Sequence, residues 1–135
     1  MLILQLNFVV FNCYLLLKHK KKTNNILNKP KMQKTIVQAG NGQQIPLYAT
    51  AVVHYTGRFL DGRVFDSSVS RGQPFEFVVG AGQVIRGWDE GVASMTQGEK
   101  CQLLCPPEYA YGNRQVGPIP ANSTLVFDVE LLGWK

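Results

Sequence analysis

Six aromatic side chains are the residues of this sequence whose types and spacing best suit a binding chemistry. They come from segments that are far apart in the chain, and they are Tyr55, Phe65, Phe75, Trp88, Tyr111 and Phe127. Strand and helix periodicity allow all of them to face one side of a fold. The sequence leaves two interpretations open, because the rings could form the core of a small domain or the walls of an apolar pocket.

Three features favour the pocket. Asp66 directly follows Phe65, so a carboxylate stands beside an aromatic ring that is expected to point inward. Arg71 is near enough in the sequence to neutralise that carboxylate. A loop over residues 108–120 carries two tyrosines and an isoleucine, which core packing explains poorly. An apolar cavity with a few placed polar groups is the usual construction of a ligand site.

Two catalytic patterns are present only in part. A Gly-Ala-Gly run at residues 80–82 precedes a predicted helix, but Ile85 stands where a dinucleotide-binding motif needs its third glycine. Ser67, His54 and Asp66 are types found in a nucleophilic triad. However, His54 and the tyrosine after it would point to opposite faces of a strand, and the sequence has no G-x-S-x-G motif. We therefore interpret His54 as an ordinary strand histidine.

The three cysteines, Cys13, Cys101 and Cys105, do not indicate a metal site or a disulfide. Cys101 and Cys105 are four apart in a predicted strand, which separates them by about 13 Å, too far for a bridge. The sequence contains no C-x-x-C spacing and no histidine cluster. Free thiols are typical of a reducing compartment, so we expect a cytoplasmic protein without a metal site.

The elements that must position the aromatic residues are mostly strands. Period-two alternation predicts them over residues 35–38, 50–55, 64–66, 75–79, 100–105 and 123–134. Asp61-Gly62 predicts a tight turn, because Asp-Gly readily supplies the positive φ angles that a hairpin needs. A proline- and glycine-rich loop precedes the last strand. The pattern indicates an antiparallel sheet.

One helix is expected among these strands, over Val84 to Val92 and extending to a glycine cap at Gly98. The apolar side chains Ile85, Trp88, Val92 and Met95 follow the spacing of a single helical face. A lone helix among strands is stable when it lies across the sheet and closes its core. The predicted fold class is therefore α+β, with an indole on the buried side of the helix.

Charge is distributed unevenly and divides the chain into an extension, residues 1–34, and a domain, residues 35–135. The extension contains seven lysines and no acid, whereas the domain has seven basic and nine acidic residues. The high overall pI therefore does not predict nucleic-acid binding. Residues 1–17 are mostly apolar but short for a bilayer span. Three interpretations stay open for the extension: a non-native addition, a weak membrane anchor that leaves the domain in the cytoplasm, or a disordered tail.

Over residues 35–132 the sequence resembles the FKBP-type peptidyl-prolyl cis-trans isomerases, which bind the macrolides tacrolimus and rapamycin. The resemblance rests on five motifs in the same order as in the family: VVHYTG at 52–57, DGRVFDSS at 61–68, VIRGWDEGV at 84–92, PPEYAYG at 106–112 and STLVFDVELL at 123–132. It implies a five-stranded antiparallel sheet wrapped around one short helix.

The resemblance also implies roles for individual residues. The catalytic set would be Tyr55, Phe65, Asp66, Trp88, Tyr111 and Phe127, and the substrate- and macrolide-binding set Arg71, Phe75, Val84, Ile85 and Ile119. Trp88 would lie under the proline ring, and the Ile85 amide and Tyr111 hydroxyl would donate hydrogen bonds to carbonyl groups of the ligand. The loop over residues 113–122 departs from the family pattern and is about one residue shorter.

Function follows from the same resemblance. We expect a monomeric peptidyl-prolyl cis-trans isomerase that acts on Xaa-Pro bonds, assists protein folding and needs no cofactor. The expected partners are proline-containing polypeptides, macrolides and a phosphatase or kinase recruited by a drug complex, with membrane contact only through residues 1–17. The alternative is a docking module that recognises proline without catalysis. Turnover of a short Xaa-Pro peptide separates the two.

Overall fold

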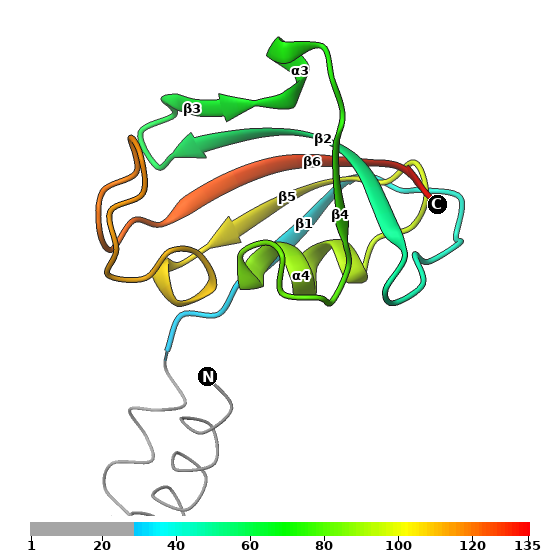
Figure 1. The fold of residues 1–135 in the computed structure, drawn as a ribbon, viewed down its shortest axis with the longest axis horizontal. Coiled ribbons are helices and arrows are strands. Elements are labelled where there is room, and N and C mark those ends of the chain that lie inside the picture. Colours follow the sequence, from blue (N-terminus) through cyan, green and yellow to red (C-terminus); the bar gives the residue numbers. More distant parts are fainter. Residues whose placement is uncertain (1–28) are drawn as a thin grey trace, which may run out of the picture. The chain divides into compact units, whose positions relative to one another are not determined.

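The computed structural model of the protein describes residues 29–135 (Figure 1). Contacts divide the chain into two units, Met1–Pro30 and Lys31–Lys135, and the architecture below is that of the second. The predictions for residues 1–28, including the apolar segment, lie outside the described residues. In the part of the chain that is described, no helix is long and apolar enough to cross a membrane.

An antiparallel sheet makes up most of the domain. Its strands are β1 (Gln33–Gln38), β2 (Thr50–Phe59), β3 (Val64–Ser67), β4 (Phe75–Val78), β5 (Lys100–Cys105) and β6 (Leu125–Trp134). They are ordered β1-β5-β6-β2-β3, and β4 also pairs with β2. Because β3 pairs with one end of β2 and β4 with the other, the two short strands share one edge position. The sheet is thus five strands wide, and the predicted α+β fold is confirmed.

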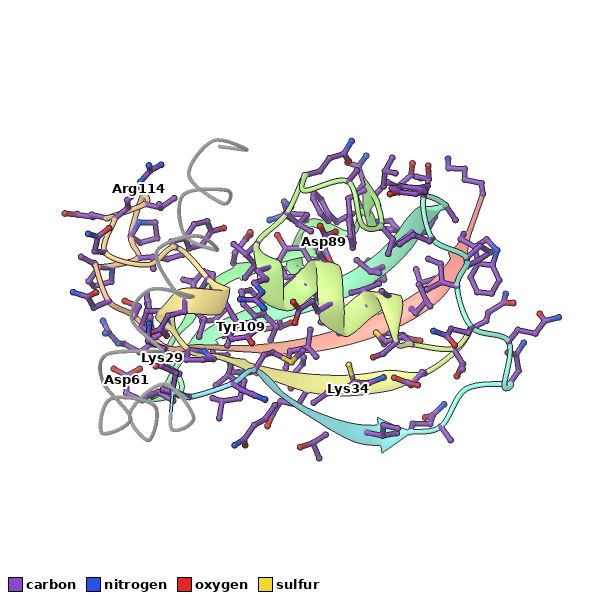
Figure 2. The ribbon with its side chains drawn as sticks, turned by 90° about the horizontal axis from the view of Figure 1, so that it is seen from below. Lys29, Lys34, Asp61, Asp89, Tyr109 and Arg114 are labelled. Carbon is purple, nitrogen blue, oxygen red and sulfur yellow. The ribbon has the colours of Figure 1, made fainter. Side chains whose placement is uncertain are left out.

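Helix α4 (Arg86–Ala93) lies across one face of this sheet, as the side-chain view from below shows (Figure 2). Trp88, Val92 and Met95 are buried beneath it, as the helical spacing predicted. The close approach of α4 to the sheet depends on Gly91, because a Cβ atom there would come within 2.8 Å of the Leu103 side chain on β5. The helix can therefore press directly on the sheet and cover its core.

Three local predictions were wrong. The helix ends at Ala93, with Ser94 in a right-handed conformation as its cap, so Gly98 is not the cap. Gly98 instead adopts a φ of +82° in the turn before β5. A one-turn helix, α3 (Ser68–Arg71), was not expected; the Ser67 side chain caps its first turn and Gly72 ends it in the left-handed region. A 3₁₀ turn, η1 (Pro107–Tyr109), interrupts the predicted loop.

Strand β1 begins at Gln33, two residues before its predicted start. Its first two residues pair with Leu104 and Leu103 of β5. An ion pair that alternation does not reveal lies at this end of the strand, where the Lys34 ammonium is 2.6 Å from Glu99 Oε2. Lys34 also donates to the Ser94 carbonyl oxygen at 3.2 Å and to its hydroxyl at 3.0 Å. Glu99 is buried. A buried carboxylate needs such a partner, so Lys34 joins the sheet to the C-terminal end of α4.

Candidate functional site

An open cavity of about 190 Å³ lies between the sheet and the N-terminal end of α4. It is lined by Tyr55, Phe65, Asp66, Phe75, Gln83, Val84, Ile85, Trp88, Tyr111 and Phe127. The fold thus brings nine of the eleven residues singled out in the sequence to one cavity. A second hollow, of about 240 Å³, surrounds His54, and Tyr55 is the only one of the six aromatic residues that borders it.

The Trp88 indole forms the floor of this cavity and is surrounded by aromatic edges. Its ring centroid lies 4.8 Å from that of Tyr55 and 5.4 Å from that of Phe127, both nearly perpendicular to it. Phe75 meets it edge-on at 5.9 Å. Edge-to-face contacts hold aromatic rings in defined positions. The indole is only 4% exposed, yet it still lines the opening, so a ligand would meet a rigid apolar surface.

A β-bulge explains how the neighbours Phe65 and Asp66 can both face the cavity. The pairing of β2 with β3 passes from Gly57–Asp66 to Arg58–Val64, so Phe65 has no partner and the strand bends. The Phe65 ring then lies against Gly57, where a Cβ atom would come within 2.6 Å of the ring. Strand parity alone would have sent one of the two side chains away from the cavity.

Tyr55, Asp66 and Arg71 form a hydrogen-bonded group at one wall. The Tyr55 hydroxyl donates to one Asp66 carboxylate oxygen, the Arg71 guanidinium donates to the other, and Arg71 Nη2 also donates to the Tyr55 hydroxyl at 3.2 Å. Burial, followed by the bond to Asp66, raises the pKa of Tyr55 above its ordinary value. Burial opposes ionisation of Asp66, but the bonds from Tyr55 and Arg71 outweigh it and lower the pKa of that carboxyl.

The Ile85 amide and the Tyr111 hydroxyl are donors at the rim of the cavity, and neither has a protein acceptor in the described part of the chain. Ile85 is the residue before the first turn of α4 and has no side-chain cap. Tyr111 is 38% exposed. Burial of its hydroxyl, and then the nearby Asp66 charge, raise the pKa of Tyr111, so it stays a donor at neutral pH. Both can therefore receive a ligand carbonyl.

Two predicted residues do not line the cavity, and one lining residue was missed. Arg71 does not line the cavity but donates hydrogen bonds to two residues that do, Asp66 and Tyr55. Ile119 is buried and exchanges two backbone hydrogen bonds of 2.9 Å with Val116, which braces the loop that carries Tyr111. Gln83 lines the rim, and its Oε1 atom accepts a hydrogen bond from the Val78 amide. Nothing in the sequence distinguishes this glutamine from other loop residues.

The alternative chemistries find no site among residues 29–135. His54 Nδ1 lies 2.9 Å from Ser68 Oγ, not from Ser67, and Asp66 is engaged by Tyr55 and Arg71 on the other side of the strand. No group of three histidine, cysteine or acidic side chains in these residues could hold a metal ion. The arrangement is that of a binding pocket that can orient a ligand without covalent chemistry.

Comparison with known proteins agrees with this geometry. Residues 41–132 match the model of the family described as FKBP-type peptidyl-prolyl cis-trans isomerase. The chain is 52% identical over 103 residues to the peptidyl-prolyl cis-trans isomerase of Schizosaccharomyces pombe, covering 75% of this chain and 92% of that protein. It is 54% identical over 98 residues to peptidyl-prolyl cis-trans isomerase Fkbp12 of Drosophila melanogaster, covering 71% and 91%. FK506-binding protein 1 of Dictyostelium discoideum is 52% identical over 102 residues, covering 75% and 95%.

The same conclusion follows from a solved structure. The crystal structure of AtFKBP13 superimposes with a TM-score of 0.73 at 37% sequence identity, covering 77% of this chain and 93% of that one. Fold, sequence motifs and aromatic cavity thus agree along the whole domain. The chain belongs to the FKBP-type peptidyl-prolyl cis-trans isomerase family and is a peptidyl-prolyl cis-trans isomerase.

Proposed function

We propose that the cavity above Trp88 receives the proline ring of an Xaa-Pro segment and accelerates rotation about the preceding peptide bond. The observation that carries this proposal is the open apolar floor with two unpaired donors at its rim. A proline ring offers only carbon atoms to such a floor, whereas the carbonyl groups on either side of it need donors. The cavity matches both requirements.

Rotation is slow in water because the planar amide is stabilised by resonance, which gives a barrier of about 18–20 kcal/mol. At the twisted transition state this resonance is lost, and the amide dipole becomes smaller. A dry aromatic cavity therefore disfavours the planar amide more than the twisted one. Catalysis then results from stronger binding of the transition state, without general acid–base chemistry.

The polar groups have positioning tasks in this proposal. The Ile85 amide and the Tyr111 hydroxyl hold the flanking carbonyl groups, so the proline ring stays in place while the chain before it turns. Two hydrogen bonds, one to Asp66 and one from Arg71, fix the Tyr55 ring, and a third bond joins Arg71 to Asp66, which keeps one wall of the cavity rigid. Such preorganisation lowers the cost of ordering the substrate.

Macrolide binding belongs to the same proposal. Relatives in Dictyostelium discoideum and Aspergillus fumigatus are named FK506-binding proteins, and the latter is 53% identical to this chain over 102 residues. A ligand with an apolar ring and adjacent carbonyl groups would use the Trp88 floor and the same two donors. We propose that this chain binds tacrolimus and rapamycin, whose complexes could present a new surface to a phosphatase or kinase.

The Trp88→Leu variant tests the floor. Loss of the indole removes the apolar platform, so we expect both FK506 affinity and kcat/KM for an Xaa-Pro peptide to fall by about tenfold or more. Trp134→Leu is the matched control, because that second indole lies at the end of β6 outside the cavity. Peptide turnover is measured by exchange NMR and the fold is checked by circular dichroism. Unchanged affinity in folded Trp88→Leu would reject the floor assignment.

The alternative expected from the sequence was a docking module that binds proline without catalysis. The relatives named as isomerases favour the enzyme, since each is matched over more than nine-tenths of its length. Saturable binding of an Xaa-Pro peptide with no increase in its isomerisation rate would favour docking. A cytoplasmic location and a role in protein folding stay predictions.

A further inference from the structure

The loop from β4 to α4 is held by a carboxylate that belongs to the helix. Asp89 Oδ1 accepts the Gly80 amide and Asp89 Oδ2 accepts the Gly82 amide, each at 2.9 Å. Both glycines have positive φ angles, +81° and +70°, which allow the two amides to converge on one acceptor. Figure 2 shows Asp89 on the part of α4 that faces this loop. The carboxylate thus closes a small ring of backbone and side chain.

This loop leads directly into the rim of the cavity. Gln83, Val84 and Ile85, the next three residues, all line it, and Ile85 carries one of the two unpaired donors. At the helix, Asp89 directly follows Trp88, which is the floor. Asp89 is also the only side chain of α4 that is hydrogen-bonded to residues 79–85, all of which the structure describes. One turn of helix therefore carries both the floor and the anchor of the rim.

We propose that Asp89 is a positioning residue for the isomerase, which holds the loop of residues 80–84 at the rim of the cavity above the Trp88 floor. The proposal rests on the use of this cavity for Xaa-Pro segments. Two charge-assisted hydrogen bonds from the glycine amides to one carboxylate restrict the loop in distance and in orientation. Without them, residues 80–84 keep only the Gln83–Val78 bond, whereas Ile85 stays attached to the helix because its carbonyl accepts the amides of Trp88 and Asp89. The stretch that leads to the Ile85 amide is then free to move.

A general effect of negative charge on the helix is separable from this role. Glu90, the next residue, carries the same charge on the same helix but is exposed and pairs with Arg86 at 2.8 Å. An exposed pair of this kind contributes little to stability. Glu90→Gln is therefore a matched control that removes a carboxylate without touching the loop.

The experiment compares Asp89→Asn, Asp89→Ala and Glu90→Gln with the wild-type protein. Two quantities are measured: hydrogen exchange of the Gly80 and Gly82 amides without substrate, and KM and kcat for an Xaa-Pro peptide. We expect Asp89→Ala to speed exchange at both amides and to lower kcat/KM by about tenfold, mainly by raising KM. Asp89→Asn should give an intermediate loss, because its amide oxygen accepts one of the two amides. Glu90→Gln should change neither quantity.

Three outcomes would overturn the proposal. Faster exchange with unchanged KM and kcat would mean that the carboxylate is only structural. Unchanged exchange would mean that it does not hold the loop. Equal losses in Asp89→Ala and Glu90→Gln would assign the effect to charge alone. Failure of the underlying function is distinguishable, because then Trp88→Leu would also keep full turnover. Asp89→Asn preserves the shape of the side chain and keeps the test available if Asp89→Ala unfolds.

Discussion

At the scale of single residues, the cavity combines an apolar floor with polar groups whose charge is constant near neutral pH. Tyr55 and Tyr111 have pKa values raised above the ordinary 10.0, and Asp66 has a pKa lowered below 3.8. Both tyrosines are therefore neutral donors and Asp66 is an anion over the whole range between those values. The Tyr55–Asp66–Arg71 group keeps one hydrogen-bonding arrangement throughout.

A flat pH profile is the corresponding prediction. Because no group lining the cavity changes charge between pH 6 and 8, kcat/KM for an Xaa-Pro peptide should change by less than about twofold across that range. Activity should fall only toward pH 3.8 and below, where protonation of Asp66 begins to break its bonds to Tyr55 and Arg71. The profile is measured in wild type and in His54→Gln, whose histidine lies on the other face of the sheet. A tenfold change between pH 6 and 8 that persists in His54→Gln would contradict a mechanism without acid–base catalysis.

At the scale of elements, the meeting of β2 and β3 decides the shape of the cavity. The bulge turns Phe65 and Asp66 to the same side, and Gly57 leaves room for the Phe65 ring. The one-turn helix α3 then places Arg71 within reach of Asp66. Three short local irregularities thus build one wall of the site on an otherwise regular sheet.

The Gly57→Ala variant tests this wall. A Cβ atom at Gly57 would lie 2.6 and 2.8 Å from two Phe65 ring atoms and 3.1 Å from Phe127, so both rings must shift. Overpacking of this kind costs about 1–3 kcal/mol of unfolding free energy. We also expect kcat/KM to fall by about tenfold, since two cavity walls move. Urea unfolding and peptide turnover are the measurements.

Gly133→Ala is the control for Gly57→Ala. It adds the same methyl group to a strand glycine whose nearest neighbour would be the end of the Gln97 side chain at 3.5 Å, an ordinary contact. Its stability and turnover should stay close to those of wild type. If Gly57→Ala behaved in the same way, the Phe65 ring would not need the space that the glycine leaves.

At the scale of the whole molecule, the core contains two thiols whose ionisation is disfavoured while the domain is folded. Cys101 and Cys105 are free, buried and on the core side of β5. Burial raises the pKa of each thiol from 9.0 to about 12. In the unfolded chain both ionise near 9, so their contribution to stability is complete below pH 9 and is lost as the pH rises toward 12.

The prediction is a steep alkaline loss of stability. Between pH 9 and 11 each thiol should lower the unfolding free energy by up to about 1.4 kcal/mol per pH unit. Replacing both by alanine should lower stability at pH 7, because cavities form, but should make its decline with pH shallower. Urea unfolding at several pH values, in a Cys13→Ser background, measures this slope. An equal slope in both proteins would show that the thiols ionise without unfolding.

The sequence by itself was sufficient to predict the strands, the helix and the aromatic residues that surround it. Period-two alternation in β2 and β6, and the spacing of Trp88, Val92 and Met95, record which side of each element faces the core. Such a pattern depends only on which face of the strand or helix is buried, so it can be read from the sequence of that element alone. It does not show where an element ends, so the end of α4 was placed too late. It also does not reveal a helix of a single turn, so α3 was missed.

Only the tertiary structure decided how the cavity is built. The bulge that aligns Phe65 with Asp66 depends on pairing with Gly57, and the anchoring of the rim depends on a carboxylate seven to nine residues beyond the amides it binds. The ion pair of Lys34 with Glu99 joins residues that are 65 positions apart in the sequence (99 − 34). Contacts of this kind depend on register and distance between elements, which no local periodicity encodes.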